Sequence, residues 1–177
     1  KTFGDAAFSI TAPSSNSNGL FSYSSSNTSV ATVSGSNINI VGAGSTIITA
    51  TQAATSNYSS GSVTATFVVA KVNPIIQAWS LASKTFGDAA FSITAPSSNS
   101  NGSFSYSSSN TNVATISGST VTIVGVGNST ITATQEATNN YNSGTTTATL
   151  TTILCFNKGT KILCYNNNQE EYIPIEN

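Results

Sequence analysis

Short runs of alternating apolar and polar residues, separated by polar turns, extend through most of the chain. The first runs are Phe8-Ser9-Ile10 and Phe21-Ser22-Tyr23, and the turn-rich stretch Pro13 to Gly19 lies between them. An apolar residue at every second position is typical of a strand with one buried face. The same pattern predicts further strands at Val30–Val33, Ile38–Val41, Ser45–Thr51 and Ser62–Val69.

Turn residues separate these runs. Ser34-Gly35-Ser36-Asn37 stands between two of the predicted strands and indicates a hairpin, and Gly42-Ala43-Gly44 breaks the chain before the next strand. About seven strands, with a turn signal roughly every 8–12 residues, are typical of a β-sandwich.

An internal repeat decides the domain organisation. Lys1–Thr28 returns as Lys84–Thr111, an offset of 83 residues, and the two segments differ only where Leu20 becomes Ser103. The match continues without a gap to Ala65-Thr66 and Ala148-Thr149. This period is too long for a solenoid repeat and suits a whole small domain. We therefore expect an array of modules that fold independently.

The boundaries follow from the phase of the repeat. Pro74 cannot sit inside a central strand and marks a junction, after which Ile75–Leu81 is predicted to be the first strand of the second module. The first module has no such lead-in, so we expect the chain to be a fragment of a longer array that begins after its true first strand. The predicted domains are module 1 at 1–73 (first strand missing), module 2 at 74–152 and a separate tail at 153–177.

A module without its first strand should expose an unpaired sheet edge. Such an edge is a template for another chain. A preceding repeat, a neighbouring copy of the protein or the tail Cys155–Asn177 could fill it by strand addition.

Differences between the two copies predict which side chains face inward. Ile47 becomes Thr130, whereas Ile48 and Ala50 return as Ile131 and Ala133. The face that tolerates the exchange of Ile for Thr should be exposed, and the alternate face should be the core. The residues expected to be mostly buried are Ile48, Ala50, Phe21, Tyr23, Ile131, Ala133, Phe104 and Tyr106, and those expected to be exposed are Ile47 and Thr130.

Composition narrows the range of functions. Charged residues make up 6% of the chain, the net charge is −1, and there is no His and no Arg. A basic footprint for nucleic acid is therefore absent, as are a polybasic membrane patch and the commonest general base. No apolar run approaches the roughly 18 residues of a membrane span. The content of Val, Ile and Thr favours ordered β structure over disorder.

Two kinds of residue, the aspartates of the turns and the aromatic residues, are candidates for binding. Asp5 and Asp88 occupy the same Phe-Gly-Asp-Ala turn of each module, but calcium needs several carboxylates, so we favour a turn-capping role and expect no metal and no cofactor. A carbohydrate-binding module would need exposed aromatic side chains. Phe3, Phe21, Tyr23 and Trp79 are candidates, and packing in the core or at the module junction explains them as well.

The loop and strand motifs of each module resemble the bacterial Ig-like (group 2) family. The residues that carry the resemblance in the first copy are Ser24–Val33 and Val41–Thr51, and in the second copy Asn110–Ile116 and Val124–Thr134. The order and spacing are similar to those in repeats of large bacterial adhesins and of related proteins in large DNA viruses. The resemblance implies a Greek-key β-sandwich used as a stalk, adhesion or carbohydrate-contacting module, and no catalytic residues come with it.

The tail has a different character. Both cysteines and five of the eleven charges lie in the last 23 residues. Cys155–Leu163 and Tyr172–Asn177 resemble the opening of Hint (hedgehog/intein) autoprocessing domains. That resemblance implies Cys155 as a nucleophile that attacks the carbonyl of Leu154. The family also needs a downstream Thr-x-x-His block, which this chain does not contain. The alternative is a linker hairpin, Thr160–Cys164 against Glu171–Ile175, whose cysteines stay reduced or pair with each other.

We therefore expect an all-β protein of two tandem Ig-like Greek-key β-sandwiches with a short C-terminal β-hairpin tail. The expected function is a non-catalytic stalk, spacer or adhesion module on a cell or virion surface, outside the cell. Its partners would be neighbouring repeats or copies of itself, with surface glycans or a host receptor as further partners. The alternatives are the displayed N-terminal part of a self-processing Hint precursor, in which Cys155 acts, and a carbohydrate-binding module.

Overall fold

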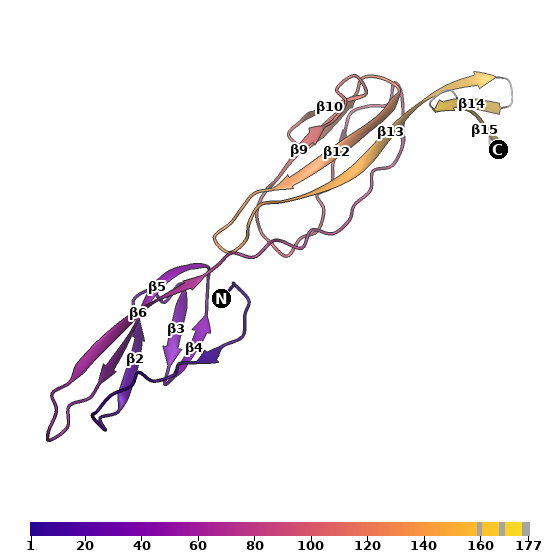
Figure 1. Cartoon of the computed structure of the whole chain (residues 1–177). Helices are drawn as coiled ribbons and strands as arrows, with labels where there is room; N and C mark the ends of the chain where they lie inside the picture. Colours follow the sequence, from indigo (N-terminus) through magenta and orange to yellow (C-terminus); the bar gives the residue numbers. More distant parts are fainter. Residues whose placement is uncertain (159–160, 167–168, 175–177) are drawn as a thin grey trace. The chain divides into compact units, whose positions relative to one another are not determined.

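The structure, a computed structural model, describes residues 1–158, 161–166 and 169–174, with side chains as far as Cys155. Every regular element in this part of the chain is a β-strand (Figure 1). The chain forms two compact units, and the boundary in the main chain falls between Asn73 and Pro74. Unit 1 comprises 1–73 together with 139–142, and unit 2 comprises 74–138 and 143–177.

Unit 1 is built of two three-stranded sheets. One has the order β1-β4-β3 and the other β2-β5-β6, with all neighbours antiparallel. The chain crosses between the sheets before β2, before β3 and before β5, which is the connectivity of an Ig-like β-sandwich. The strands are β1 (Phe8–Ser9), β2 (Phe21–Ser25), β3 (Ala31–Ser34), β4 (Asn37–Ile40), β5 (Gly44–Gln52) and β6 (Gly61–Val69).

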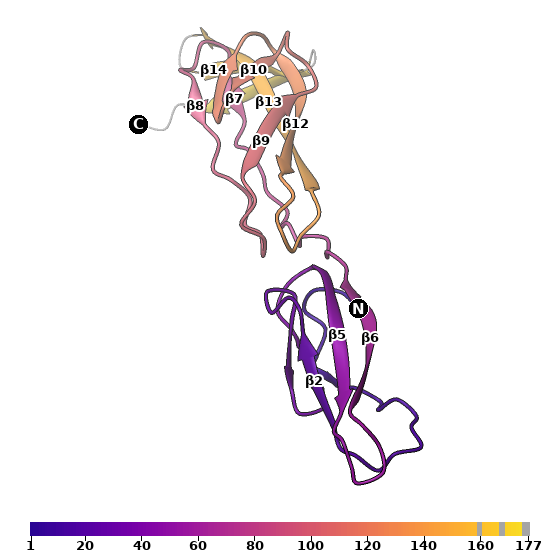
Figure 2. The same ribbon diagram turned by 90° about the vertical axis from the view of Figure 1, so that its left-hand side faces the viewer.

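Unit 2 repeats this arrangement and adds to it. Its sheets have the orders β10-β11-β8 and β9-β12-β13, and β7 pairs in parallel with β13 (Figure 2). The corresponding strands are β7 (Lys84–Thr85), β8 (Phe91–Ser92), β9 (Phe104–Ser108), β10 (Ala114–Ser117), β11 (Thr120–Ile123), β12 (Gly127–Gln135) and β13 (Gly144–Lys158). The predicted all-β class, with two Ig-like Greek-key sandwiches, is confirmed.

The tail extends the second sheet of unit 2. β13 continues past the sandwich and pairs with β14 (Lys161–Asn166), which in turn pairs with β15 (Gln169–Pro174). The predicted β-hairpin tail is present, with Cys164 opposite Glu171. The family assignment of 153–177 as a Hint-like start stays a prediction, and its residues 159–160, 167–168 and 175–177 lie outside the described residues.

The predicted hairpin between β3 and β4 forms as its residues indicate. Ser34 pairs with Asn37, which leaves Gly35-Ser36 as a two-residue turn. Gly35 has a φ of 58°, and its counterpart Gly118 has a φ of 59°. Turns of this length need a left-handed residue, and glycine adopts that conformation without steric cost.

The predicted inward faces of β5 and β12 are confirmed. Ile48 and Ala50 are 8% and 6% exposed, Ile131 and Ala133 are 0% exposed, and Ile47 is 47% exposed. Thr130 is also exposed. The aromatic residues expected to be mostly buried, Phe21, Tyr23, Phe104 and Tyr106, are only half-buried. Their rings stack in pairs, Phe21 on Tyr23 within β2 and Phe104 on Tyr106 within β9.

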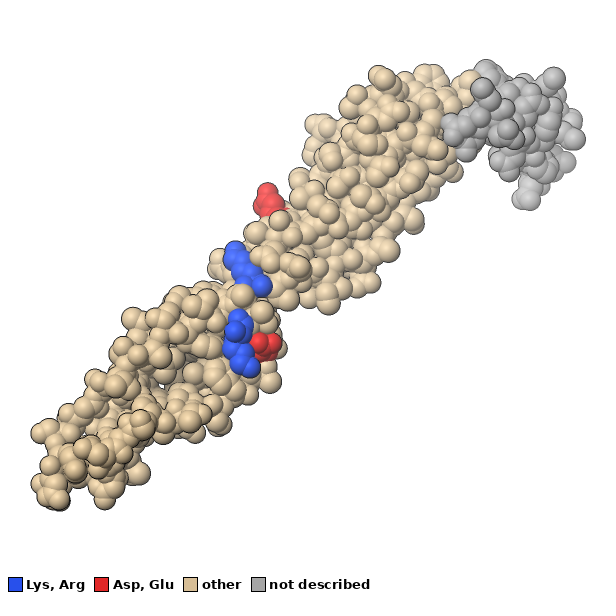
Figure 3. All heavy atoms as spheres, viewed as in Figure 1, with Lys and Arg blue, Asp and Glu red and all other residues tan. Residues whose placement is uncertain are grey.

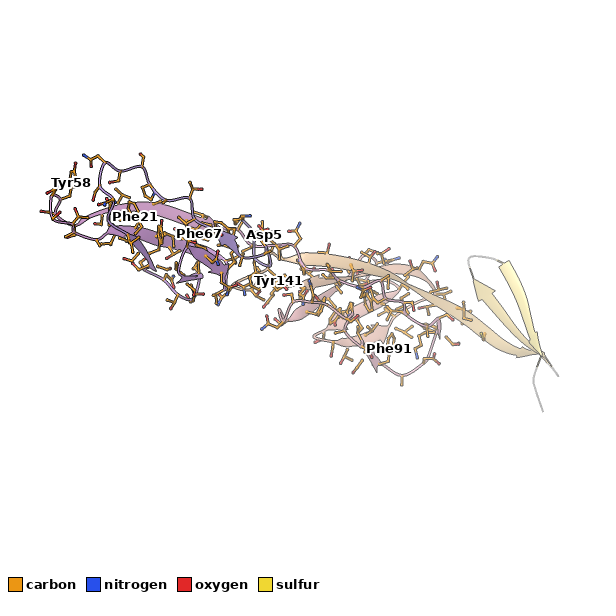
Figure 4. The ribbon with its side chains drawn as sticks, turned by 90° about the horizontal axis from the view of Figure 1, so that it is seen from below. Asp5, Phe21, Tyr58, Phe67, Phe91 and Tyr141 are labelled. Atoms are coloured by element: carbon orange, nitrogen blue, oxygen red, sulfur yellow. The ribbon has the colours of Figure 1, made fainter. Side chains whose placement is uncertain are left out.

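Each unit has its own hydrophobic core. In unit 1 Phe67 packs against Ala31, Ile38 and Ile48, and its ring lies 5.5 Å from that of Phe8. In unit 2 the fully buried side chains include Val121, Ile131 and Leu150, and Trp79 and Leu81 from the lead-in pack against this cluster. Phe67 and Phe91, one from each core, are labelled in Figure 4.

The prediction of a strand at Ile75–Leu81 is wrong. Only Ile76 makes a β-bridge, with Ser98, and the first strand of unit 2 is β7. The backbone of this lead-in bonds instead to the loop that contains Ser97 and Asn99. Trp79 and Leu81 pack against the core without forming a ladder, whereas Ile75 is exposed.

Candidate functional site

Cys155 lies on β13 just beyond the sandwich, where the ladder places it opposite Cys164. It is disulfide-bonded. Nucleophilic attack on Leu154 requires a thiolate, so this bond must be reduced before Cys155 can act. The role of Cys155 as a nucleophile stays a prediction.

Asp5 and Asp88 cap turns. The Thr2 backbone N–H donates to one carboxylate oxygen of Asp5 at 2.9 Å, and the Thr2 hydroxyl donates to the other at 3.1 Å. Thr85 N–H donates to Asp88 in the same way, at 2.9 Å. The two bonds from Thr2 lower the pKa of the Asp5 carboxyl, because they stabilise its charged form. Asp5 is labelled in Figure 4.

Clusters of chemically active side chains are not found in the described part of the chain. No three His, Cys, Asp or Glu residues in that part lie close enough together to hold a metal ion. The face drawn in Figure 3 carries few charges on either unit. No helix long and apolar enough to span a membrane occurs among the described residues.

The aromatic candidates for carbohydrate binding are all half-buried. Trp79 packs against the core of unit 2, and its ring lies 6.1 Å from that of Tyr106. Phe21 and Tyr23 stack on each other at 6.3 Å, and Phe3 meets Tyr141 edge-on at 5.7 Å within unit 1. Packing therefore accounts for the position of each.

The lead-in of unit 2 fills a groove between the start of β13 and the loop before β9. A Cβ atom added to Gly144 would come within 2.7 Å of Pro74 Cγ and 3.0 Å of Ile76 Cδ1. Gln77 N–H donates to the Ser97 carbonyl at 3.0 Å, and Ile75 N–H donates to Asn99 Oδ1 at 2.8 Å. These contacts hold the backbone of Pro74–Gln77 as an additional short extended segment at the sandwich edge.

The equivalent groove of unit 1 is open. It is a cavity of about 210 Å³, and we call it the β6 groove. A Cβ atom added to Gly61, the counterpart of Gly144, would meet no atom within 4 Å. Phe21, on its wall, and Asp5 lie toward opposite ends of unit 1 (Figure 4). The residues that line the groove are Pro13, Ser14, Ser15, Phe21, Ala50, Gln52, Gly61, Ser62 and Val63.

The inner face of β6 in unit 1 is less well covered than the inner face of β13 in unit 2. Val63 and Ala65 alternate with outward residues and share a face with the buried Val69. Val63 is nevertheless 54% exposed, and Ala65 is exposed too. Ala148, the counterpart of Ala65, is 7% exposed. The inner face of β6 is therefore uncovered at the end that borders the groove.

Residues 91–149 match the family model of the bacterial Ig-like domain (group 2). This segment contains β8 to β12 and the beginning of β13, which is most of the sandwich of unit 2. No curated protein matches the chain. Among solved structures, the crystal structure of Drosophila N-cadherin EC1-4 is similar at 10% identity and a TM-score of 0.35, over 82% of this chain and 44% of that one. The chain thus spans less than half of that cadherin chain.

Sequence reasoning did not identify the residues that form the groove, and the predicted unpaired sheet edge stays a prediction. Gly61 and Gly144 recur at the same place in the repeat, as do Gln52 and Gln135. A glycine kept at the start of a long strand is a signal for close approach of another backbone or ring. That signal, combined with the proline of the lead-in, could have located the site.

Proposed function

We propose that the chain is a non-catalytic spacer of an extracellular stalk or adhesion protein, built from Ig-like repeats. The group 2 match in unit 2 and the same strand plan in unit 1 support an array of similar modules. By the 83-residue repeat, the family extends to the first module as well.

The path of the chain through unit 2 is the observation that carries this proposal. The chain enters beside the start of β13, where Pro74 approaches Gly144, and leaves at the far end of the same strand, after Thr152. The nine residues from Gly144 to Thr152 span about 30 Å. A module with entry and exit at opposite ends adds its own length to an array.

Parallel pairing of β7 with β13 suits a spacer under tension. Lys84 and Thr85 pair with Thr152 and Ile153. A pull on the two ends of the unit slides these strands past each other, so their hydrogen bonds share the load. Low charge and the disulfide at Cys155 support a place outside the cell, because disulfides persist in oxidising surroundings.

Pulling the chain by its two ends in a single-molecule force experiment tests the spacer role. We expect two separate unfolding events, one for each unit. The event for unit 2 should lengthen the chain by about 260 Å, from the contour length between Pro74 and Leu154 less the folded span. Extension without any resisted event would contradict the proposal.

The self-processing precursor is the second candidate. Thr152 is the last residue of β13 that pairs with β12, so cleavage at the Leu154–Cys155 bond would release a complete sandwich. The resemblance of the tail to Hint domains motivates this candidate, and the disulfide at Cys155 requires a reducing step first.

A further inference from the structure

Threonine side chains form a regular grid on the outer face of unit 2. β12 and β13 are neighbours in one sheet (Figure 1), and their inner face carries the buried Ile131, Ala133 and Leu150. Successive side chains of a strand point to opposite faces, so the residues between these point outward. Six of the outward residues form three cross-strand pairs, which we call the Thr grid: Thr130 opposite Thr149, Thr132 opposite Thr147, and Thr134 opposite Thr145.

The spacing of the Thr grid follows from strand geometry. Successive outward residues of one strand are about 6.6–6.8 Å apart, and neighbouring strands are about 4.7–4.9 Å apart. The twist between neighbouring strands is about 20–25°, so a pair of strands stays flatter than a wider sheet. Each threonine is branched at Cβ, which restricts χ1 and limits the positions of its hydroxyl and methyl groups. The result is a nearly rectangular array of identical, preorganised side chains.

The hydroxyl groups of the Thr grid are directed to solvent. Four of the six threonines are exposed, and Thr132 and Thr134 are half-buried. Thr130 N–H donates to Ser109 Oγ at 2.9 Å, and the Thr134 carbonyl accepts from Ser105 Oγ at 3.5 Å. These contacts to serine side chains use backbone groups of the threonines. They leave the threonine hydroxyls for a partner outside the protein.

The surroundings of the Thr grid are uncharged. The other outward residues of this sheet are Ser105 and Ser107 of β9, Asn128 of β12 and Thr151 of β13. No charged residue occurs in β9, in β12 or in β13 as far as Thr152. Such a face offers no electrostatic attraction to a polyanion or a polycation. Its chemical complement is a neutral surface with hydrogen-bonding groups at a regular spacing.

The Thr grid is complete in unit 2 and interrupted in unit 1. Of the three corresponding pairs in unit 1, one consists of two threonines, Thr49 opposite Thr64. Ile47 interrupts the second pair and Ser62 the third. Both positions are threonine in the second copy of the repeat. Unit 1 therefore supplies a matched comparison on the same chain.

We propose that the Thr grid of unit 2 binds the surface of ice. The oxygen atoms on the prism face of hexagonal ice form a rectangular lattice with spacings close to those of the grid. Ice is also neutral and presents hydrogen-bond donors and acceptors at every lattice position. The threonine hydroxyls bond to water molecules of this lattice, directly or through bridging waters, and the methyl groups fill the spaces between them.

Binding by the Thr grid orders few groups that were free before. Its side chains are already arrayed on two paired strands, and preorganisation lowers the cost of binding. A polysaccharide is a poorer match, because Phe104 and Tyr106 pair within the sheet on its inner side and leave the grid without an aromatic ring for a sugar to stack on. Ice binding does not depend on the spacer role, since a unit that gives way under load can still bind ice.

Partition of the full chain into slowly growing ice tests the proposal. The measured quantity is the share of protein taken up by the ice, relative to a non-binding protein in the same solution. We expect enrichment of the wild type. Thr147→Lys should lower this ratio at least about tenfold, because a charged side chain loses its hydration against ice. The matched control Thr64→Lys alters the counterpart in unit 1, where the grid is interrupted, and should partition as the wild type does.

Completion of the grid in unit 1 provides a test by gain of binding. The double variant Ile47→Thr with Ser62→Thr should raise the ratio at least about twofold, because the chain then carries two complete grids. Exclusion of the wild type from ice, or equal partition of Thr147→Lys and Thr64→Lys, would overturn the proposal. Adsorption to insoluble chitin or cellulose without enrichment in ice would also overturn it, with a polysaccharide as the occupant.

Discussion

Ile47 and Ile48 are neighbours in the sequence and have opposite surroundings. Ile47 is 47% exposed and is replaced by Thr130 in the second unit, whereas Ile48 is 8% exposed and returns as Ile131. A strand turns successive side chains to opposite faces, so a single exchange between two copies identifies both faces. Comparison of the two copies therefore shows which position of the strand tolerates a polar residue.

Truncation of the core residue should be costly and truncation of its neighbour should not. Ile131→Ala should lower the free energy of unfolding of unit 2 by about 2–5 kcal/mol, since Ile131 is 0% exposed. Ile47→Thr should change that of unit 1 by less than about 0.5 kcal/mol. Urea unfolding measures both. A larger loss for Ile47→Thr than for Ile131→Ala would show that the faces are assigned the wrong way round.

The turn at Asp5 predicts a pH dependence. The hydrogen bonds from Thr2 lower the pKa of Asp5 in the folded state. The carboxylate thus favours folding above the unfolded pKa of about 3.9, and this contribution is lost as the pH falls through the lower, folded pKa. Carboxyl carbon NMR should find Asp5 titrating below about 3.9. Thr2→Val removes only the hydroxyl bond and should raise the pKa part of the way; an Asp5 pKa at or above 3.9 in the wild type would refute the turn-capping role.

At the scale of elements, the strands that alternate cleanly were predictable and the lead-in was not. The expected strand Ser45–Thr51 is β5, Gly44–Gln52, and Ser62–Val69 is β6, Gly61–Val69. In both strands the alternation of apolar and polar residues in the sequence extends over the same residues as the ladder of paired residues. Trp79 and Leu81 of the segment Ile75–Leu81 are partly buried for another reason, because they pack against the core from an irregular segment that bonds to a loop.

The β6 groove could not be derived from local sequence. Its filled form depends on contact between Pro74 and Gly144, which are far apart in the chain. Neither residue alone indicates the other, because a glycine before a strand is more often a turn residue. What the sequence could predict was that Gly61 and Gly144 recur at the same place in the two copies.

Substitution of the two equivalent glycines should have unequal effects. Gly144→Val should lower the free energy of unfolding of unit 2 by about 1–3 kcal/mol, because the new side chain collides with Pro74 and Ile76. Gly61→Val should leave unit 1 within about 0.5 kcal/mol of the wild type, since no atom lies within 4 Å. Thermal unfolding followed by calorimetry distinguishes the two. Equal losses would mean that the groove of unit 1 is closed.

The tail hairpin allows a test of the self-processing alternative. With Cys155 disulfide-bonded, no cleavage at Leu154–Cys155 is expected in the oxidised protein. The 177-residue chain should also stay intact after reduction, since it has no His to act as general acid or base. A longer chain with a complete Hint domain should cleave on reduction, and Cys155→Ala should prevent this.

Mass spectrometry with and without added thiol reads the result directly. An intact long chain after prolonged reduction would leave the linker hairpin as the role of the tail. Cleavage of the 177-residue chain would show that the missing His is dispensable.

At the scale of the whole molecule, the repeated units and the parallel pairing of β7 with β13 support the proposed role as a spacer under tension. Each unit has its own core, and unit 2 places its entry and exit at opposite ends of β13. Load applied along the chain falls on β7 and β13, which pair in parallel at Lys84–Thr85 and Thr152–Ile153. We therefore propose that this arrangement transmits tension along the chain.

The most direct test compares two directions of pull on unit 2, with the second attachment at the C-terminal end in both. In the first the chain is held by its N-terminus, so β7 and β13 are sheared. In the second direction the chain is held at a cysteine introduced by Ala89→Cys, just after the C-terminal end of β7. The native cysteines are removed by Cys155→Ser and Cys164→Ser, so that the attachment is unique. The force then acts on the C-terminal ends of both parallel strands and peels β7 from β13. A spacer predicts that unit 2 unfolds at a clearly higher force in the first direction. Equal forces, or a higher force on peeling, would contradict the account.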